Sequence, residues 1–282
     1  MSWQIFLIVS IFAEVAGRLL QRILLKNDKS DPVAYSVVTQ LITGTLVGIF
    51  ALTQGFSIPD ISTIWPHLIA MPIVWGLANL LVYKSLKNTE ASVFVIIFST
   101  RAIWQIVGAV LFLNETFSVL QVIGTILIFG SVVLISSRDA KLSLKKTEIF
   151  AALAAIFFAI AMINDAFVIR TFDVASYLTF GYFAPSLLIW LMHPKKTSEI
   201  ISIARNKSVW KIGILASLFG TAALTTLLAY KLGNNAAQIG ALFQISTILT
   251  VFAAVFLLNE KKSLKLKIIA GVISMIGVIL II

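Results

Sequence analysis

Runs of about twenty mainly apolar residues recur along the whole chain, and they constrain its fold more than any other feature. Such a run is long enough to cross the hydrocarbon core of a bilayer as one α-helix. Only 12% of the 282 residues are charged, whereas about a quarter are charged in soluble domains. The sequence therefore predicts an all-α membrane protein with ten spanning helices. The expected spans are residues 4–25, 33–53, 65–86, 91–113, 118–136, 148–169, 174–192, 209–230, 235–258 and 266–282.

The two halves of the chain carry matching residues in the same order, which indicates an internal repeat. The fourth predicted span ends in Leu113-Asn114-Glu115 and the ninth ends in Leu258-Asn259-Glu260. Five spans per copy is an odd number, so the second copy must enter the membrane from the opposite side. We therefore predict an inverted repeat of residues 1–137 and 147–282, an arrangement that secondary transporters use. Further matched pairs are Tyr83 with Tyr230, Gly124 with Gly271, and Gly130 with Gly277.

The net charge of +10 comes from basic residues in the short loops. In a soluble protein this charge would suggest a nucleic-acid partner. Here the basic residues lie in loops between spans, where they fix the orientation of the protein in the membrane, so no nucleic acid is expected. Of the 22 basic residues, 17 fall on the side of the membrane opposite the two termini. Basic loops face the cytoplasm. We therefore predict a protein of the cytoplasmic membrane with both termini external.

With this plan, the chain resembles the EamA-type transporters of the drug/metabolite transporter superfamily. The resemblance rests on two five-span halves, on the Asn-Glu segments at 112–115 and 257–260, and on the glycines of the fifth spans. It implies a ten-helix inverted repeat that moves small metabolites by alternating access. It also implies a central cavity lined mainly by the first, third and fourth helices of each half, with the fifth more peripheral. Many relatives have cytoplasmic termini, which leaves the direction of transport open.

The first span carries four polar residues at a spacing that places them on one helix face, namely Glu14, Arg18, Gln21 and Arg22. A charge within the hydrocarbon costs several kcal/mol unless it is paired or hydrated. One interpretation is that Glu14 and Arg18 line the translocation cavity and that Glu14 binds solute or a proton. The alternative is an ion pair between them that holds the bundle together. Arg22 is expected to extend to the cytoplasmic surface.

Arg101 lies near the middle of the fourth span, followed by Trp104 and Gln105 on the same helix face. A guanidinium beside a flat indole suits a carboxylate or another planar anionic group. Arg101 could instead neutralise Glu14 across helices one and four, and both can hold in turn if substrate displaces the carboxylate. The corresponding region of the second half is uncharged and offers Gln244. The charged part of the site is therefore expected in the first half.

Asp165 in the sixth span is a further candidate. A buried carboxylate can exchange protons, so Asp165 joins Glu14 as a candidate for proton coupling, unless it is simply hydrated near the external end. Trp75 and Asn79 in the third span are expected to contact substrate. Isolated polar residues in spans also often bond only to neighbouring helices. Lesser candidates are Tyr83, Thr225, Thr226 and Gln238.

No catalytic, metal or cofactor site is expected. The chain has no Cys, and His67 and His193 are its only histidines, too few for a zinc site. It also lacks a Gly-Lys-Ser/Thr phosphate loop. We therefore predict a secondary transporter for a small polar or amphipathic metabolite, including amino-acid-like solutes. Its partners are a small-molecule substrate and membrane lipid, and the chain is expected to be a monomer or weak homodimer. The alternatives are a non-transporting binding or scaffold protein, a lipid-translocation component, and an intramembrane enzyme.

Overall fold

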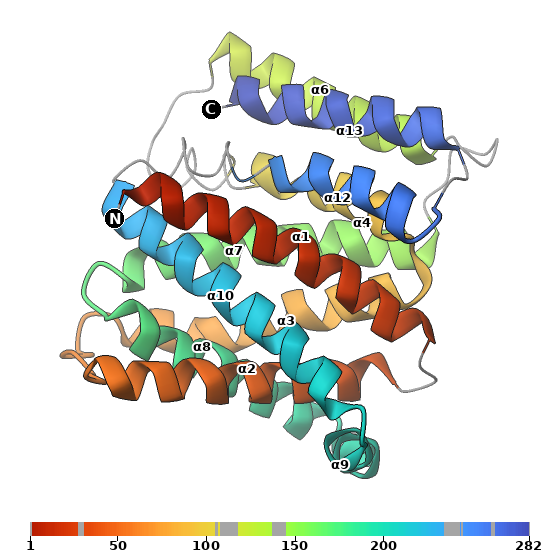
Figure 1. Ribbon diagram of the computed structural model, residues 1–282. Helices are drawn as coiled ribbons and strands as arrows, with labels where there is room; N and C mark the ends of the chain where they lie inside the picture. The colour runs from red at the N-terminus through yellow and green to blue at the C-terminus, as the bar shows by residue number, and fades with distance from the viewer. Residues whose placement is uncertain are drawn as a thin grey trace.

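The computed structural model describes residues 2–27, 31–104, 107, 118–136, 145–233, 243, 245–260 and 263–281 (Figure 1). All regular structure within these residues is helical, which confirms the predicted all-α class. The first half contains α1 (Trp3–Asn27), α2 (Pro32–Gln54), α3 (Trp65–Asn88), α4 (Ala91–Phe98) and α6 (Val119–Ser136). The second half contains α7 (Lys146–Val168), α8 (Val174–Met192), η2 (Pro194–Lys196), α9 (Thr197–Arg205), α10 (Val209–Gly233), α12 (Ile245–Leu257) and α13 (Leu264–Ile281).

Six helices in the described part of the chain are long and apolar enough to cross a membrane, namely α1, α2, α3, α7, α8 and α10. Their bounds agree with the predicted spans to within a few residues. Shorter apolar helices cover 91–104, 122–135 and 245–257. Parts of the fourth and ninth predicted spans, 91–113 and 235–258, lie outside the described residues. The composition and the helix lengths therefore indicate an integral membrane protein.

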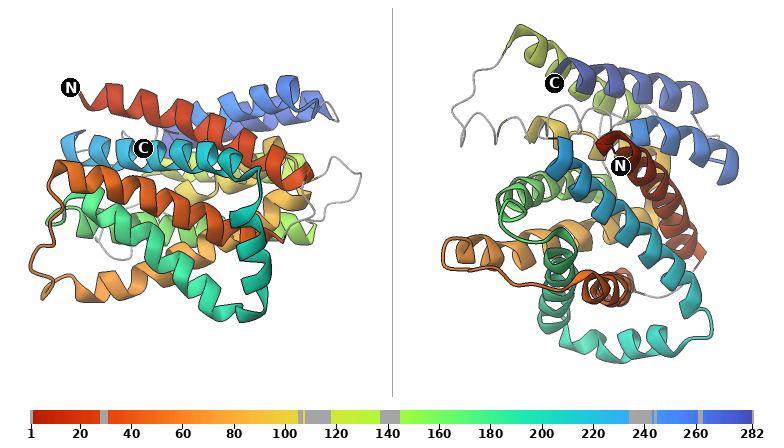
Figure 2. Two further views of the ribbon diagram at one scale, coloured as in Figure 1. Left: turned by 60° about the horizontal axis from the view of Figure 1, so that its bottom comes forward. Right: turned by 60° about the vertical axis from the view of Figure 1, so that its left-hand side comes forward.

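The helices pair across the two halves in a regular way. The first helix of each half packs on the third helix of the other half, giving the pairs α1–α10 and α7–α3. The second helices pack on each other as α2–α8, the fourth as α4–α12 and the fifth as α6–α13. This set of pairs is unchanged when the two halves are exchanged. Figure 1 and the right-hand view of Figure 2 show α6 and α13 together at one edge of the bundle, and both termini lie toward the same end in Figure 1.

Helix ends follow local sequence signals. Asp31 caps α2 by accepting a hydrogen bond from the Val33 N–H at 2.8 Å, and Pro32 occupies the first helical turn. The same helix ends at Gly55, whose φ of 89° is left-handed and costs glycine little. Asp173 caps α8 through the Ser176 N–H. These caps place the ends of α2 and α8, two helices that face the centre of the bundle.

The fourth span contains a short break in its α-helical hydrogen bonding, although residues 91–104 still form one apolar helical segment. After Phe98 the backbone turns at Ser99 and Thr100, and helix resumes at Arg101. The N–H groups of Thr100 and Ala102 bond to carbonyls three residues back, at 3.2 and 3.1 Å. The side-chain hydroxyls of Ser99 and Thr100 also donate to carbonyls three residues earlier, at 2.6 and 2.8 Å. Such side-chain bonds compete with the α-helical pattern. The break therefore lies directly before Arg101.

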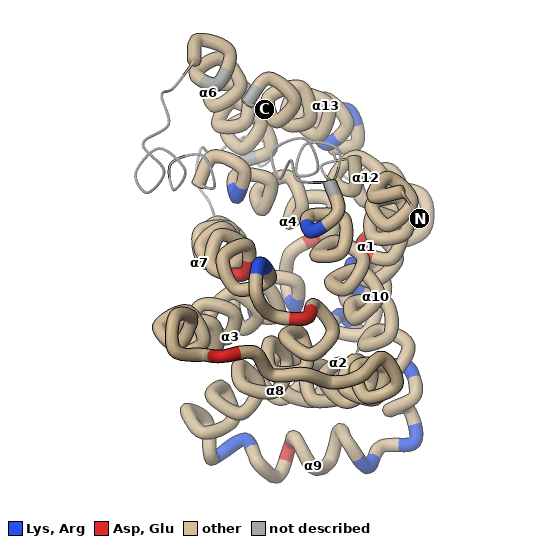
Figure 3. Tube along the Cα trace, turned by 90° about the vertical axis from the view of Figure 1, so that its left-hand side faces the viewer, with Lys and Arg blue, Asp and Glu red and all other residues tan. Residues whose placement is uncertain are grey.

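The predicted loop 193–208 contains the short helix α9. This helix is seen end-on in Figure 1, roughly perpendicular to the long helices. It buries Ile200 and Ile203 while Lys and Arg residues flank it at both ends (Figure 3). The high proportion of charged residues suggested a loop, but burial of two isoleucines against the bundle accounts for the helix.

The second Asn-Glu segment joins the two halves at the end of the bundle opposite the termini. Asn259 adopts a φ of 53°, a left-handed conformation that asparagine tolerates, and it ends α12. The carboxylate of Glu260 then accepts hydrogen bonds from the backbone N–H groups of Ala91 and Ser92 at 2.9 and 3.1 Å. Glu260 of the second half thereby caps α4 of the first. The matching segment, residues 112–115, lies outside the described residues.

Candidate functional site

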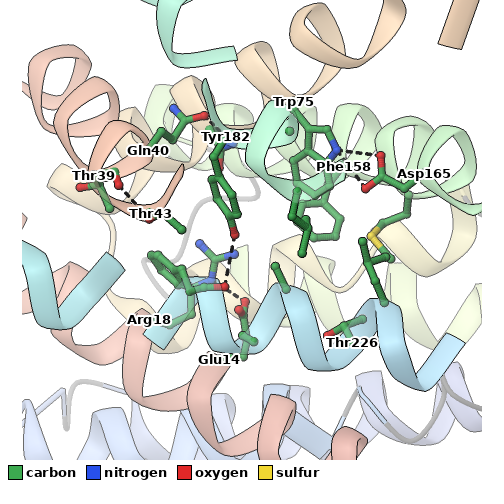
Figure 4. Close-up of a pocket in the computed structure, with 18 of the residues that line it drawn as sticks. Glu14, Arg18, Thr39, Gln40, Thr43, Trp75, Phe158, Asp165, Tyr182 and Thr226 are labelled. Atoms are coloured by element: carbon green, nitrogen blue, oxygen red, sulfur yellow. Dashed lines mark hydrogen bonds and ion pairs between the residues drawn. The ribbon is translucent and has the colours of Figure 1, made fainter. Parts of the chain in front are cut away.

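A cavity of about 120 Å³ lies between the two halves (Figure 4). The first three helices of each half line it, together with Arg101 and Phe243 from the fourth helices. The second helices, α2 and α8, thus add to the lining that the family resemblance implied. None of the described lining residues comes from α6 or α13. The polar and aromatic members are Glu14, Arg18, Gln21, Thr39, Gln40, Thr43, Trp75, Asn79, Tyr83, Arg101, Phe158, Asp165, Tyr177, Tyr182, Phe219, Thr226, Tyr230 and Phe243.

The polar face of α1 forms one wall of the cavity. Arg18 Nε donates to the Glu14 carboxylate at 2.7 Å, and Arg18 Nη1 donates to Gln21 Oε1 at 3.1 Å. The structure therefore places the ion pair of Glu14 within α1. Arg22 does not extend into water as expected: it is buried and donates to the Leu86 and Lys87 carbonyls at 2.6 and 2.8 Å. Arg22 thus completes the hydrogen bonds at the end of α3.

Arg101 lies on the cavity with only 5% of its surface exposed. Its guanidinium carbon lies 4.8, 5.1 and 5.3 Å from the ring centres of Phe98, Phe158 and Phe243. No hydrogen bond or ion pair joins it to the described residues. A desolvated cation–π contact stabilises by roughly 2 kcal/mol, whereas an uncompensated buried charge costs several kcal/mol. The three phenylalanine rings therefore offset only part of the cost of burying the Arg101 charge.

Of the other residues predicted beside Arg101, only Trp104 lies in the described part of the chain. Trp104 packs against the main hydrophobic core and does not line the cavity. Gln105 and Gln244 lie outside the described residues. The flat surface beside the guanidinium is therefore supplied by phenylalanines, which the sequence spacing did not single out.

Asp165 lies across the cavity from Glu14 and Arg18, and its side chain is buried, with 2% of the residue exposed. Trp75 Nε1 lies 3.1 Å from both of its carboxylate oxygens, and the Tyr177 hydroxyl donates to one of them. All three hydrogen-bond contacts come from neutral groups. Asp165 is thus a buried acid without a basic partner among the described residues, and the Glu14–Arg18 pair lies on a different side of the cavity (Figure 4).

The residues between these two walls come mainly from α2 and were not predicted. Asn79 Nδ2 donates to Gln40 Oε1 at 3.2 Å. Asn79 was predicted from the sequence to line the cavity, and Gln40 was not. Thr39 and Thr43 follow the same helix face and bond to their own backbone. The signal was present in the sequence, because Gln40 is an amide in the middle of an apolar span. Tyr83 and Thr226, which the sequence had offered as lesser candidates, also line the cavity.

Comparisons with known proteins agree with this architecture. A family model described as "EamA-like transporter family" matches residues 1–137 and again residues 145–282. No curated protein matches the chain. A solved crystal structure superposes with a TM-score of 0.62 at 15% identity, covering 96% of this chain and 97% of that one. At this identity the superposition shows a shared fold.

Proposed function

The chain belongs to the EamA-like transporter family, and from that premise we propose that it is a secondary transporter. It carries a small polar or amphipathic metabolite, such as an amino-acid-like solute, across the cytoplasmic membrane by alternating access. The observation that carries the proposal is the cavity itself. A hollow that contains Glu14, Arg18, Arg101 and Asp165 among largely apolar and aromatic residues lies between helices long and apolar enough to span a membrane, where charges need a functional reason.

The ten-span inverted repeat is part of this proposal. Two matches of one family model support a division into repeats 1–137 and 147–282. The exchange of helix pairs between halves, with α1 on α10 and α7 on α3, supports a two-fold relation between them. Two gates related in this way open alternately to the two sides of the membrane while the site stays in place.

We assign substrate contact to residues that line the cavity and proton coupling to its acids. Glu14, Arg18, Trp75, Asn79 and Arg101 are the described members of the substrate site. Glu14 and Asp165 are the candidates for proton coupling. The sequence predicted substrate contact for three further residues, Trp104, Gln105 and Gln244.

The proposed orientation places both termini outside the cell. It is supported by 17 of 22 basic residues at the end opposite the termini. A reporter enzyme that is active only outside the cytoplasm, fused after Ile282, is expected to be active. An inactive fusion, with an active cytoplasmic reporter at the same position, would reverse the assignment.

Transport by purified protein in proteoliposomes tests the function. Counterflow of labelled metabolites across a broad panel is expected to identify at least one solute that exchanges. The Arg101→Gln variant should lose that flux, while Arg170→Gln, whose arginine is exposed outside the cavity, should retain it. Folded protein that exchanges nothing and co-purifies with a partner chain would favour a scaffold or lipid-translocation component.

A further inference from the structure

The cavity contains two guanidinium groups with different surroundings. The charged residues that line it within the described chain are Glu14, Arg18, Arg101 and Asp165. Glu14 and Arg18 form a 2.7 Å ion pair and cancel each other. Arg101 has aromatic neighbours but no carboxylate within ion-pair distance in the described chain. Within the described part of the chain, Arg101 is therefore the cavity cation that lacks a carboxylate partner and can pair with a ligand.

Asp165 does not fill that role. Its carboxylate is held by Trp75 and Tyr177, and the ring of Phe158 contacts both this indole and Arg101. The ring centres of Trp75 and Phe158 are 4.9 Å apart, and the Arg101 guanidinium lies 5.1 Å from the same Phe158 ring. Arg101 thus lines the cavity beside the rings of Phe98, Phe158 and Phe243.

The backbone supports the same location. The fourth span breaks at Ser99 and Thr100, immediately before Arg101. Interrupted spanning helices commonly occur where a transporter binds its substrate.

Resting on the proposed function, we propose that the substrate is a small organic acid, bound as a carboxylate by Arg101 with an apolar or aromatic body against Phe98, Phe158 and Phe243. A guanidinium binds a carboxylate through two parallel hydrogen bonds. The cavity of about 120 Å³ is comparable with the roughly 150 Å³ that accommodates benzene in an engineered protein cavity. The expected substrates are therefore small monocarboxylates, in which the carboxylate extends toward Arg101 from an apolar body no larger than a benzene ring.

This assignment has a consequence for the ligand-free protein. A buried cation without a partner destabilises the fold that contains it. Replacing Arg101 by glutamine removes the charge and keeps much of the volume. The variant is therefore expected to unfold at a higher temperature than the natural protein while losing the ligand, a combination that a purely structural arginine would not give.

Thermal unfolding of the purified protein in detergent tests the proposal, because a ligand that binds the native state raises the unfolding temperature. The probes are benzoate, phenylacetate and 3-methylbutanoate, each compared with its neutral amide, and benzenesulfonate and phenyl phosphate as other anions. At least one carboxylate is expected to raise the unfolding temperature while its amide does not. Arg101→Gln should weaken that carboxylate at least about 30-fold, and Arg170→Gln should bind it normally.

The proposal is overturned if no carboxylate shifts the unfolding temperature, or if amides act as well as acids. It is also overturned if only the sulfonate or phosphate binds, or if Arg101→Gln retains carboxylate binding. These outcomes are distinct from a failure of the transport proposal. Carboxylate binding without flux in proteoliposomes would reject transport alone, whereas flux of a neutral solute without carboxylate binding would reject the substrate class alone.

Discussion

Arg18 and Arg101 lie over the same aromatic ring, with guanidinium carbons 5.6 and 4.8 Å from the centre of Phe98, yet among the residues that the structure describes only Arg18 has a carboxylate partner. The two residues share an environment and differ in their pairing. Removing one member of a buried ion pair destabilises a protein, whereas removing a buried charge that has no partner can stabilise it. Removing the charge of Arg18 is therefore expected to destabilise the protein, whereas Arg101→Gln is expected to stabilise it.

Replacing Arg18 by glutamine is expected to destabilise the protein by about 3–5 kcal/mol, because Glu14 would be left with its charge and no cation beside it. The double variant Glu14→Gln/Arg18→Gln should recover most of that loss. Thermal or denaturant unfolding of the three variants gives the coupling between the residues. Additive losses in the double variant would mean that the ion pair contributes nothing as a pair.

Asp165 is predicted to couple transport to protons. Asp165→Asn keeps the shape but cannot release a proton, and its amide can accept from Trp75 and Tyr177 at only one oxygen. The variant should still exchange substrate between the two sides of a proteoliposome but should no longer accumulate it in response to a pH gradient. Asp60→Asn, at an exposed loop position, should behave as the natural protein. Accumulation by Asp165→Asn equal to that control would remove Asp165 from the coupling step.

The parts of the fold set by local patterns were predictable from the sequence. Apolar runs located the six long helices closely. The break before Arg101 was not predictable from hydropathy, because Ser99 and Thr100 are compatible with a spanning helix. The hydroxyls of Ser99 and Ser274 are in contact there and join the end of α4 to α13.

The candidate site was predicted less completely than the fold. Charged residues were easy to identify, since each is costly in an apolar span. The direction of an uncharged side chain depends on how helices rotate against each other, so the contributions of Gln40 and Phe158 could not be derived from spacing. The ion pair of Glu14 was left open between Arg18 and Arg101 for the same reason, because both arginines were within reach in principle.

The fifth helices offer a test of packing away from the cavity. A Cβ atom added to Gly277 on α13 would lie 2.7 Å from the Gly124 carbonyl oxygen on α6, a backbone atom that cannot move alone. Gly277→Ala should therefore destabilise the protein by about 1–3 kcal/mol and separate the two helices. Gly130→Ala is the matched control, because nothing lies within 4 Å of its added Cβ, and alanine favours helix. Equal unfolding temperatures for both variants would contradict the α6–α13 contact.

Glu260 provides the test of how the halves are held together. Its carboxylate accepts from the N–H groups of Ala91 and Ser92 and from the Ser92 hydroxyl, so it satisfies groups that the start of α4 would otherwise bury unpaired. Glu260→Ala is expected to cost about 1–2 kcal/mol of stability. Glu199→Ala, on the peripheral helix α9, is the control and should change stability little.

The same cap also predicts how accessible the cavity is from the end of the bundle opposite the termini. Losing the link between α12 and α4 should favour separation of the two halves there. Because the natural chain has no cysteine, a single Gln21→Cys substitution on the cavity wall can be labelled with a membrane-impermeant maleimide. Labelling from that side should be faster in the Glu260→Ala background than in the Glu199→Ala background. Equal labelling rates, in protein that is folded, would mean that Glu260 stabilises α4 without holding this end closed.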